Sequence, residues 1–321
     1  MPGEGLGWGK IESRRILPLA MGIIRRRMKR SIAPLGLSLL LAACTVGPTV
    51  SNPSPTPTTI PTATPEPLAA QVNGGGILLA DYEDEVARFE AAQVLLGTDL
   101  ASLGDYRRQV LQALIDRLVL TQGAVEAGHS FDEAAVDAEL EAVAQARGGS
   151  EAMGAWMAEN RYTIGSLKRA LREDQLSAMM IEDITQSIDE NAEQVRAAHI
   201  LVASRPEAED LQAELSAGAD FADLARQASL DASTRPAGGD LGWFPPGYLL
   251  VPEVDQAAWS LAPGETSDII ESGLGYHIVR VLERADHPLR PDALRFLREQ
   301  AVVVWLQTRQ ATAPIEIFVA P

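Results

Sequence analysis

The stretch FADLARQASLDASTRPAGGDLGWFPPG, residues 221–247, is the most informative part of the sequence. Its consecutive glycines at 238–239 permit backbone angles and close approaches that other residues forbid. Large apolar side chains follow at once within 241–244, and a flexible linker would not need such walls. Together with LVPEV at 250–254, the stretch predicts a loop that wraps an apolar cleft, a common design for binding a peptide or a small ligand.

Two histidines lie in similar apolar runs on either side of this stretch. His199 is at the centre of RAAHILVAS (196–204), and His277 is at the centre of GLGYHIVRV (273–281). The chain has four histidines, so half of them occupy this one local context. Taken alone, such a run is more typical of a strand with a satisfied core histidine than of a catalytic group.

Short β-rich runs alternate with short helices around the two histidines. AAHILVA precedes the helical segments PEAEDLQAELSAG and DFADLARQAS, and PEVDQAAWSLA precedes GYHIVRVLE. The two middle helices have a core face made by Leu211 with Leu215 and by Phe221 with Leu224. This pattern predicts one compact α+β domain of about 90 residues over 196–284.

The chain before this domain shows helical periodicity from about residue 76 to 190. In YRRQVLQALIDRLVLTQGAVEAG the apolar positions starting at Val110 form one stripe, and Gly128 follows as a stop signal. After the domain, DALRFLREQAVVVWLQTRQ predicts a last amphipathic helix, which has no core of its own. We therefore expect a helical domain at 71–195 and a C-terminal segment at 285–321 whose helix packs back on it.

The order of these motifs is similar to that of a known family. AAHILV, FADLARQASLD, GGDLGWF, PGE at 263–265 and GYHIVRV occur in the order and spacing of a parvulin-type peptidyl-prolyl cis/trans isomerase domain. The resemblance covers about 196–284, and five ordered motifs are specific where any one would be weak. It implies a small domain with a four-stranded antiparallel sheet flanked by helices.

The rest of the chain resembles the chaperone module of the bacterial foldases PrsA and SurA. This second resemblance rests on the architecture of a helical block followed by a returning helix, more than on motifs. The expected fold class is therefore α+β, with a mostly helical SurA-like module and a small parvulin domain.

The resemblance to parvulins also implies which residues form the catalytic site. His199 and His277 would stand side by side on neighbouring strands at the floor of the cleft, which favours a site position over a plain core position. Asp231 falls where the family places a Cys or an Asp beside the prolyl amide. The loop from Asp231 to Asp240 is about one residue longer than in many relatives, so Ala232 is an alternative for that position.

A proline-binding pocket is implied by the same resemblance. The expected substrate-binding residues are Leu241, Phe244, Leu250, Val254 and Ser272. The family more often has Met where Leu250 stands and Phe where Val254 stands. A shallower pocket with weaker catalysis is therefore an alternative to a fully active one.

The implied reaction requires no metal and no cofactor. Rotation about a prolyl amide has a barrier of about 18–20 kcal/mol and breaks no bond, and an apolar cleft can favour the twisted amide over the planar form. The two histidines lack a third ligand at a spacing typical of zinc sites. No serine lies in a G-x-S-x-G pattern, which argues against a serine hydrolase.

The charge of the chain restricts its partners. The formal net charge is −17 and the pI is about 4.7, whereas phosphate binding needs clustered Lys and Arg. Residues 1–43 carry eight basic and two acidic side chains, so the remainder of the chain has a charge of −23. We therefore expect no nucleic-acid partner.

The amino terminus indicates export and a lipid anchor. RRRMKR at 25–30 is a positive segment, and LGLSLLLAA at 35–43 is apolar but too short to span a bilayer. LAAC, which ends at Cys44, resembles a bacterial lipobox, and a Pro/Thr-rich tract follows. We expect a signal peptide at 1–43, a lipidated Cys44 and a tether at 44–70; a plain secretory signal or an anchor helix is the alternative.

These expectations combine into one functional hypothesis. The sequence predicts a lipid-anchored foldase of the bacterial cell envelope, outside the cytoplasm, which binds unfolded or newly exported polypeptides and isomerises their X-Pro bonds. The alternative is a holdase chaperone whose parvulin domain binds peptides but is weak or inactive as a catalyst.

Overall fold

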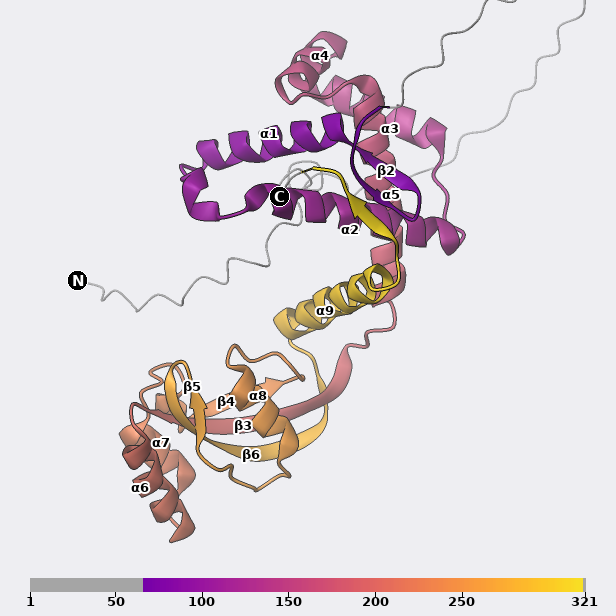
Figure 1. The fold of residues 1–321 in the computed structure, drawn as a ribbon. Helices are drawn as coiled ribbons and strands as arrows, with labels where there is room; N and C mark the ends of the chain where they lie inside the picture. Colours follow the sequence, from indigo (N-terminus) through magenta and orange to yellow (C-terminus); the bar gives the residue numbers. More distant parts are fainter. Residues whose placement is uncertain (1–65, 320–321) are drawn as a thin grey trace, which may run out of the picture. The chain divides into compact units, whose positions relative to one another are not determined.

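The structure of the protein is a computed structural model that describes residues 66–319 (Figure 1). The expected signal peptide, Cys44 and most of the tether lie outside the described residues. The described chain divides into two compact units. One unit contains residues 66–118, 132–172 and 313–319, and the other contains residues 119–131 and 173–312.

The first unit is mostly helical. Its helices are α1 (Leu79–Leu95), the short 3-10 helix η2 (Leu100–Leu103), α3 (Glu133–Arg147), α4 (Ser150–Glu159) and the first parts of α2 (Tyr106–Glu126) and α5 (Ile164–Thr185). Asp132 caps the N-terminus of α3, where its side chain accepts a hydrogen bond from Ala134 N, and Gly148 in the left-handed conformation caps the C-terminus. The core that joins α3, α4 and α5 consists of Val136, Leu140, Ala144, Met153 and Leu167.

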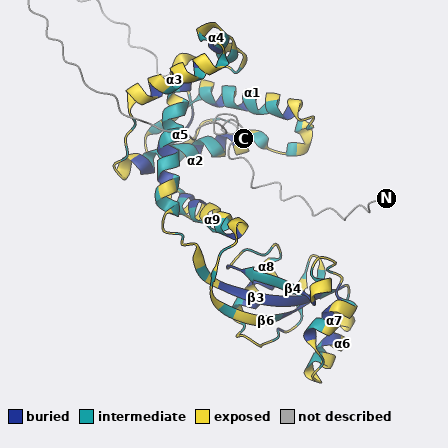
Figure 2. Cartoon of the chain, turned by 180° about the vertical axis from the view of Figure 1, so that it is seen from behind, coloured by how far each residue is buried: buried dark blue, intermediate teal, exposed yellow. Residues whose placement is uncertain are grey.

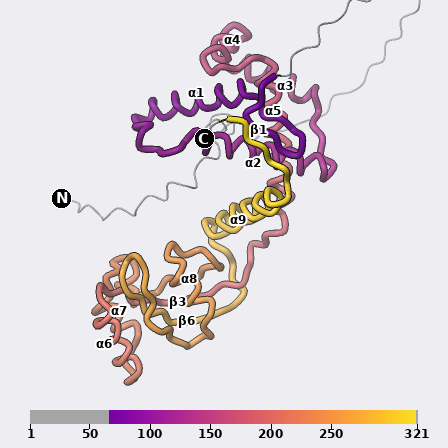
Figure 3. Tube along the Cα trace, viewed as in Figure 1, coloured from indigo at the N-terminus to yellow at the C-terminus, as the bar shows by residue number. Residues whose placement is uncertain are grey.

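A small antiparallel sheet in this unit was not part of the sequence prediction. Its strands β1 (Leu68–Val72), β2 (Gly75–Leu78) and β7 (Ile315–Ile317) pair in the order β2-β1-β7. Figure 3 shows the yellow carboxyl end of the tube beside the indigo β1. Strand β7 has three residues and pairs with a segment from the other end of the described chain, so local periodicity could not indicate it.

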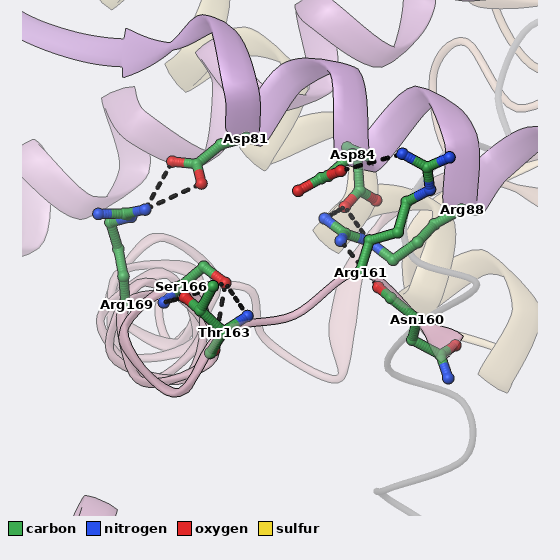
Figure 4. A network of polar contacts seen from close by, with 9 residues as sticks. Asp81, Asp84, Arg88, Asn160, Arg161, Thr163, Ser166 and Arg169 are labelled. Carbon is green, nitrogen blue, oxygen red and sulfur yellow. Dashed lines mark hydrogen bonds and ion pairs between the residues drawn. The ribbon is translucent and has the colours of Figure 1, made fainter. Parts of the chain in front are cut away.

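Polar contacts at the surface of the first unit join α1 to the segment around the end of α4 and the start of α5. Arg169 pairs with Asp81 (Figure 4), with Nη2 2.8 Å from Oδ2, and Arg88 Nη1 donates to the backbone oxygen of Asn160 at 3.2 Å. Because the Arg169–Asp81 pair is exposed to solvent, it contributes about 1 kcal/mol or less to stability.

The second unit contains a four-stranded antiparallel sheet in the order β4-β3-β6-β5, which confirms the predicted α+β fold. Its strands are β3 (Asn191–Val202), β4 (Asp240–Phe244), β5 (Ile270–Ser272) and β6 (Gly275–Pro288). The helices that accompany it are α6 (Arg205–Ser216), α7 (Phe221–Ala228) and α8 (Pro252–Ser260), with the short 3-10 helix η3 (Arg235–Ala237). Strands β3 and β6 form a long central pair.

Alternation along β3 gives this sheet two buried faces, and Figure 2 shows most of β3 in dark blue. Ala198, Ile200 and Val202 pack with α6 and α7. Val195 and Ala197 belong to a second core cluster, with Phe244 of β4 and residues of α8. His199 follows Ala198 and therefore points to the face that α8 covers.

Helix α9 (Pro291–Gln310) packs on the ends of α2 and α5 within the second unit. Gly123 of α2 leaves room for the Trp305 ring, because a Cβ at position 123 would lie 2.6 Å from Trp305 Cη2 and 3.3 Å from Met180 Sδ. Val302 and Leu306 of the same helix are buried. None of the helices within residues 66–319 is long and apolar enough to cross a membrane.

Candidate active site

The two histidines of the central strands lie beside each other. In the β3–β6 ladder His199 is opposite Val279 and His277 is opposite Leu201, so the imidazoles occupy diagonal positions on one face. Their ring centroids are 5.6 Å apart and the two Nδ1 atoms are 3.4 Å apart. His199 is 7% exposed and His277 is 0% exposed, so each ring must find its polar partners within the protein.

Asp231 is the partner of His199 on the side away from His277. Its Oδ2 lies 2.8 Å from His199 Nε2, and it also accepts a hydrogen bond of 2.5 Å from Thr234 Oγ1. The other oxygen, Oδ1, accepts from Ser233 Oγ at 2.6 Å and from Ser233 N at 3.0 Å. Asp231, and not Ala232, therefore supplies the polar group beside His199.

Ser272 is the partner of His277 at the other end. Its Oγ lies 2.7 Å from His277 Nε2, and it accepts a hydrogen bond of 3.1 Å from Leu274 N. Ser272 ends β5 and Gly275 begins β6, so the tight turn between these strands positions the hydroxyl. The result is a continuous polar chain from Asp231 through His199 and His277 to Ser272.

One arrangement of hydrogens satisfies this whole chain. An ionised Asp231 accepts only, so His199 carries its hydrogen on Nε2 and its Nδ1 accepts from His277 Nδ1. His277 Nε2 is then an acceptor, and the Ser272 hydroxyl donates to it. The contacts thus assign one tautomer to each ring, with the hydrogens inferred from the network.

The environment fixes the charge of two members of the chain. Burial works against ionisation of Asp231, but hydrogen bonds from Ser233, Thr234 and His199 outweigh it and hold the pKa of the carboxyl well below its usual range. Burial, together with the neighbouring His199, lowers the pKa of His277 from 6.5 to about 4. At neutral pH this chain of hydrogen bonds therefore has a carboxylate at its Asp231 end and an uncharged imidazole at His277.

The paired glycines hold β4 close to His199. His199 N donates to Gly239 O at 2.9 Å, and Gly239 has a φ of +80°. A Cβ at this position would lie 2.2 Å from the backbone oxygen of His199, so no larger residue fits. The close approach that the sequence predicted for 238–239 is made against the strand of the first histidine.

The apolar residues expected in the pocket lie at different depths. Leu241 is partly buried, whereas Phe244 and Val254 are 1% and 2% exposed and form the core between the sheet and α8. In this conformation these two side chains offer almost no surface to a ligand. Leu250 is 61% exposed and lies outside that core cluster, while its neighbour Leu249 packs against the cluster.

Asp255 explains why Leu249 and not Leu250 packs inward. It is a buried residue of α8 whose carboxylate accepts hydrogen bonds from Gly247 N at 2.8 Å and from Leu249 N at 3.0 Å. This fixes the loop before α8. Neither Asp255 nor Leu249 was identified as a functional residue from the sequence. Asp255 lies in the first turn of a helix that begins at a proline, and an acid at that position is a signal for a side chain that accepts hydrogen bonds from the preceding loop.

The other two histidines take no part in this series of hydrogen bonds. His129 Nε2 lies 2.6 Å from Asp183 Oδ2, and His287 stacks on Trp243 with 4.6 Å between the ring centroids. Within residues 66–319 no three His, Cys, Asp or Glu side chains are close enough together to hold a metal ion.

A second surface feature of this unit is an open apolar groove between the end of α5 and α9. Its volume is about 620 Å³. The apolar residues that line it are Ile184, Ile188, Leu297, Ala301, Val304 and Trp305. The groove shares no residue with the polar chain of the sheet.

Comparison with known proteins assigns the class of protein that this fold and site define. Residues 182–283 match the PPIC-type PPIase domain, and residues 21–181 match the SurA-like N-terminal domain. The chain belongs to the family with a SurA-like N-terminal domain and carries a parvulin domain after it. Both resemblances inferred from the sequence are therefore confirmed.

The similar curated proteins include foldases. The chain is 30% identical over 181 residues to foldase protein PrsA of Geobacillus kaustophilus, which covers 55% of this chain and 62% of that protein. It is 45% identical over 92 residues to foldase protein PrsA of another Geobacillus species, covering 29% of this chain and 33% of that protein. The matched regions thus span from one third to about three fifths of these relatives.

Similar solved structures include PrsA from Bacillus anthracis and a small parvulin. The first is 24% identical, with 66% of this chain and 99% of that chain covered and a TM-score of 0.40. The second, NmPin of Nitrosopumilus maritimus, is 33% identical, with 29% of this chain and 98% of that chain covered and a TM-score of 0.27.

Proposed function

We propose that this protein is a foldase that catalyses cis/trans isomerisation of X-Pro peptide bonds and also binds unfolded chains. The observation that supports it most directly is the continuous chain from Asp231 through His199 and His277 to Ser272. It lies within the segment that matches the PPIC-type PPIase domain. His199, Asp231 and His277 are the proposed catalytic residues.

The proposed mechanism needs only a rigid polar floor and an apolar wall. A prolyl amide loses resonance and charge separation as it twists, so a surface that favours the twisted form over the planar form lowers the barrier. Lowering it by about 3–5 kcal/mol would accelerate isomerisation roughly a hundred- to several-thousand-fold. The hydrogen-bonded imidazoles do not have to reorganise during this rotation.

The proposed proline-binding wall consists of Leu241 and Leu249, with Leu250 at its exposed rim. Phe244 and Val254 support this wall from the core, and they would contact substrate only if the loop before α8 moved. Ser272 is proposed to orient His277 and to reach substrate only through it. Leu250 and Val254 stand where the family more often has Met and Phe, so the rim of this wall and its support from the core are both smaller than in those relatives.

The helical part of the chain is proposed to bind unfolded clients. The SurA-like N-terminal domain and the similarity to foldases named PrsA support this role. The apolar groove between α5 and α9 is a candidate surface for it, because exposed apolar grooves are typical of sites that bind apolar segments of other chains. Unfolded or newly exported polypeptides are the proposed partners.

A holdase without significant isomerase activity is the second candidate, and the burial of Phe244 and Val254 favours it. A protease-free assay with a prolyl peptide, run beside an aggregation assay with a chemically unfolded protein, separates the two. A foldase accelerates isomerisation above the uncatalysed rate. A holdase suppresses aggregation and leaves the isomerisation rate at background.

We further propose that the protein is anchored in the bacterial cell envelope, outside the cytoplasm, by a lipid on Cys44. The apolar stretch before this residue and the foldase relatives support the proposal. Mass spectrometry of the protein extracted from membranes is the test. A fatty-acylated peptide that begins at Cys44 is expected, and an unmodified chain that begins elsewhere would contradict the anchor.

A further inference from the structure

The loop after α7 is closed onto His199 by a ring of four hydrogen bonds. His199 Nε2 and Thr234 Oγ1 both contact Asp231 Oδ2, at 2.8 and 2.5 Å. Gly239 N donates to Thr234 O at 2.9 Å, and His199 N donates to Gly239 O at 2.9 Å. The ring therefore connects the side chain and the backbone of His199 through three residues of one loop.

Thr234 has a position in this ring that the turn itself does not require. The turn is made by backbone contacts, since Arg235 N donates to Asp231 O at 2.9 Å and Ala237 N donates to Thr234 O at 2.9 Å. Ser233 N and Oγ both donate to Asp231 Oδ1, as is usual where an Asp begins a turn. The Thr234 hydroxyl instead donates to Oδ2, the oxygen that faces the imidazole.

The two oxygens of Asp231 are therefore held from different sides. Ser233 occupies Oδ1, and Thr234 shares Oδ2 with His199. A carboxylate fixed at both oxygens cannot rotate about its Cβ–Cγ bond without losing at least one charge-assisted hydrogen bond. The Oδ2 lone pair that receives the His199 hydrogen is thus kept in place.

We propose that Thr234 is a positioning residue that aims Asp231 Oδ2 at His199 Nε2 and thereby selects the tautomer of the histidine pair. The inference rests on the proposed isomerase function for its catalytic meaning, but its structural content is independent of it. If the Nε2 hydrogen of His199 is fixed by Asp231, then Nδ1 remains an acceptor for His277. Without the Thr234 hydrogen bond, Asp231 Oδ2 would no longer be held toward His199 Nε2, and His199 would also populate the tautomer with its hydrogen on Nδ1.

The test uses the full chain labelled with ¹⁵N-histidine. Long-range ¹H–¹⁵N spectra at neutral pH distinguish a protonated ring nitrogen from an unprotonated one. In the wild-type chain we expect His199 with its hydrogen on Nε2. In Thr234→Val we expect a mixture of both tautomers and a fall of about three- to tenfold in kcat/KM for a prolyl peptide, with both restored by Thr234→Ser.

Two control variants separate positioning from folding. Ser233→Ala leaves the backbone N–H of Ser233 on Oδ1 and does not touch Oδ2, so the His199 spectrum is expected to stay as in the wild type. Thr185→Val removes a hydroxyl that donates to Ile181 O within α5, far along the sequence from the four hydrogen bonds around His199. We expect this variant to keep the wild-type His199 spectrum and the wild-type kcat/KM. If Thr234→Val does not fold, Thr234→Ala removes the hydroxyl without adding a methyl group at that position.

The His199 spectrum and the rescue by Thr234→Ser decide whether Thr234 is a positioning residue. An unchanged His199 spectrum in the folded hydroxyl-free variant would overturn the proposal, as would a loss that Thr234→Ser does not restore. If the wild-type chain shows no isomerase activity, the spectrum still tests Thr234, because it reports the tautomer and not turnover. A failure of the proposed function is thus distinguishable from a failure of the positioning role.

Discussion

At the scale of single residues, His277 shows how burial changes the acid sensitivity of the fold. Its pKa is lowered from 6.5 to about 4 because the ring is buried and lies next to His199. The unfolded chain therefore binds a proton on this residue between pH 6.5 and 4 that the folded chain does not bind. Protonation of the unfolded state must then reduce stability as the pH falls through this interval.

We predict that the free energy of unfolding decreases by about 3 kcal/mol from this residue as the pH falls from 6.5 to 4. Urea unfolding at a series of pH values measures the slope, and His277→Gln should flatten it. Asp231 adds acid sensitivity only below its ordinary pKa of 3.8, because its folded pKa is lower still. Equal slopes for the wild type and His277→Gln between pH 6.5 and 5 would contradict the buried neutral histidine.

Gly239 gives a second prediction at this scale. In Gly239→Ala the new Cβ would meet His199 O at 2.2 Å at a φ of +80°, so we expect a loss of about 3 kcal/mol or more. Gly242→Ala is the matched control, since Gly242 also has a positive φ but open space around its Cβ position. It should lose only about 1 kcal/mol, and equal losses in thermal unfolding would show that the contact with His199 is unimportant.

At the scale of secondary-structure elements, α9 depends on a glycine of another helix. A Cβ on Gly123 would lie 2.6 and 2.7 Å from Trp305 ring atoms. We predict that Gly123→Ala destabilises the protein by about 1–3 kcal/mol through overpacking. Gly154→Ala, in α4 with nothing near its Cβ position, should instead stabilise by about 0.5–1 kcal/mol because alanine favours a helix. Chemical unfolding compares the two, and a stable Gly123→Ala would disprove the tight contact.

The loop before α8 depends on Asp255. Asp255→Asn replaces one acceptor by a donor, so either Gly247 N or Leu249 N loses its partner. We predict a loss of about 1–3 kcal/mol and a weaker affinity for prolyl peptides, because the Leu249 wall is no longer fixed. Fluorescence titration with a labelled peptide measures the second effect. An unchanged affinity would remove Leu249 from the proposed pocket.

The elements also show what the sequence could and could not predict. The histidine strands, the close approach at Gly239 and the helix cores were predictable, because strand alternation, paired glycines and helical spacing are local signals. The depth of Phe244 and Val254 was not, since burial depends on how α8 lies on the sheet. The choice between Leu249 and Leu250 was also hidden, because two neighbouring leucines differ only through the loop that Asp255 holds.

At the scale of the whole molecule, the polar chain on the sheet and the groove between α5 and α9 share no side chain. The proposed isomerase and chaperone activities should therefore be separable. We predict that His199→Ala abolishes isomerisation and leaves suppression of aggregation within about twofold of the wild type. Light scattering of an unfolded client measures the second activity. Parallel loss of both in a folded variant would show that one site serves both.

Asp231, His199, His277 and Ser272 together are the proposed site of prolyl isomerisation. Exchange NMR spectroscopy of a prolyl peptide measures its isomerisation rate with catalytic amounts of protein. We expect the kcat/KM of the wild type to exceed that of His199→Ala by at least about a hundredfold. We expect wild-type kcat/KM for His287→Ala, near the far end of β6. Equal acceleration by the wild type and His199→Ala would contradict it.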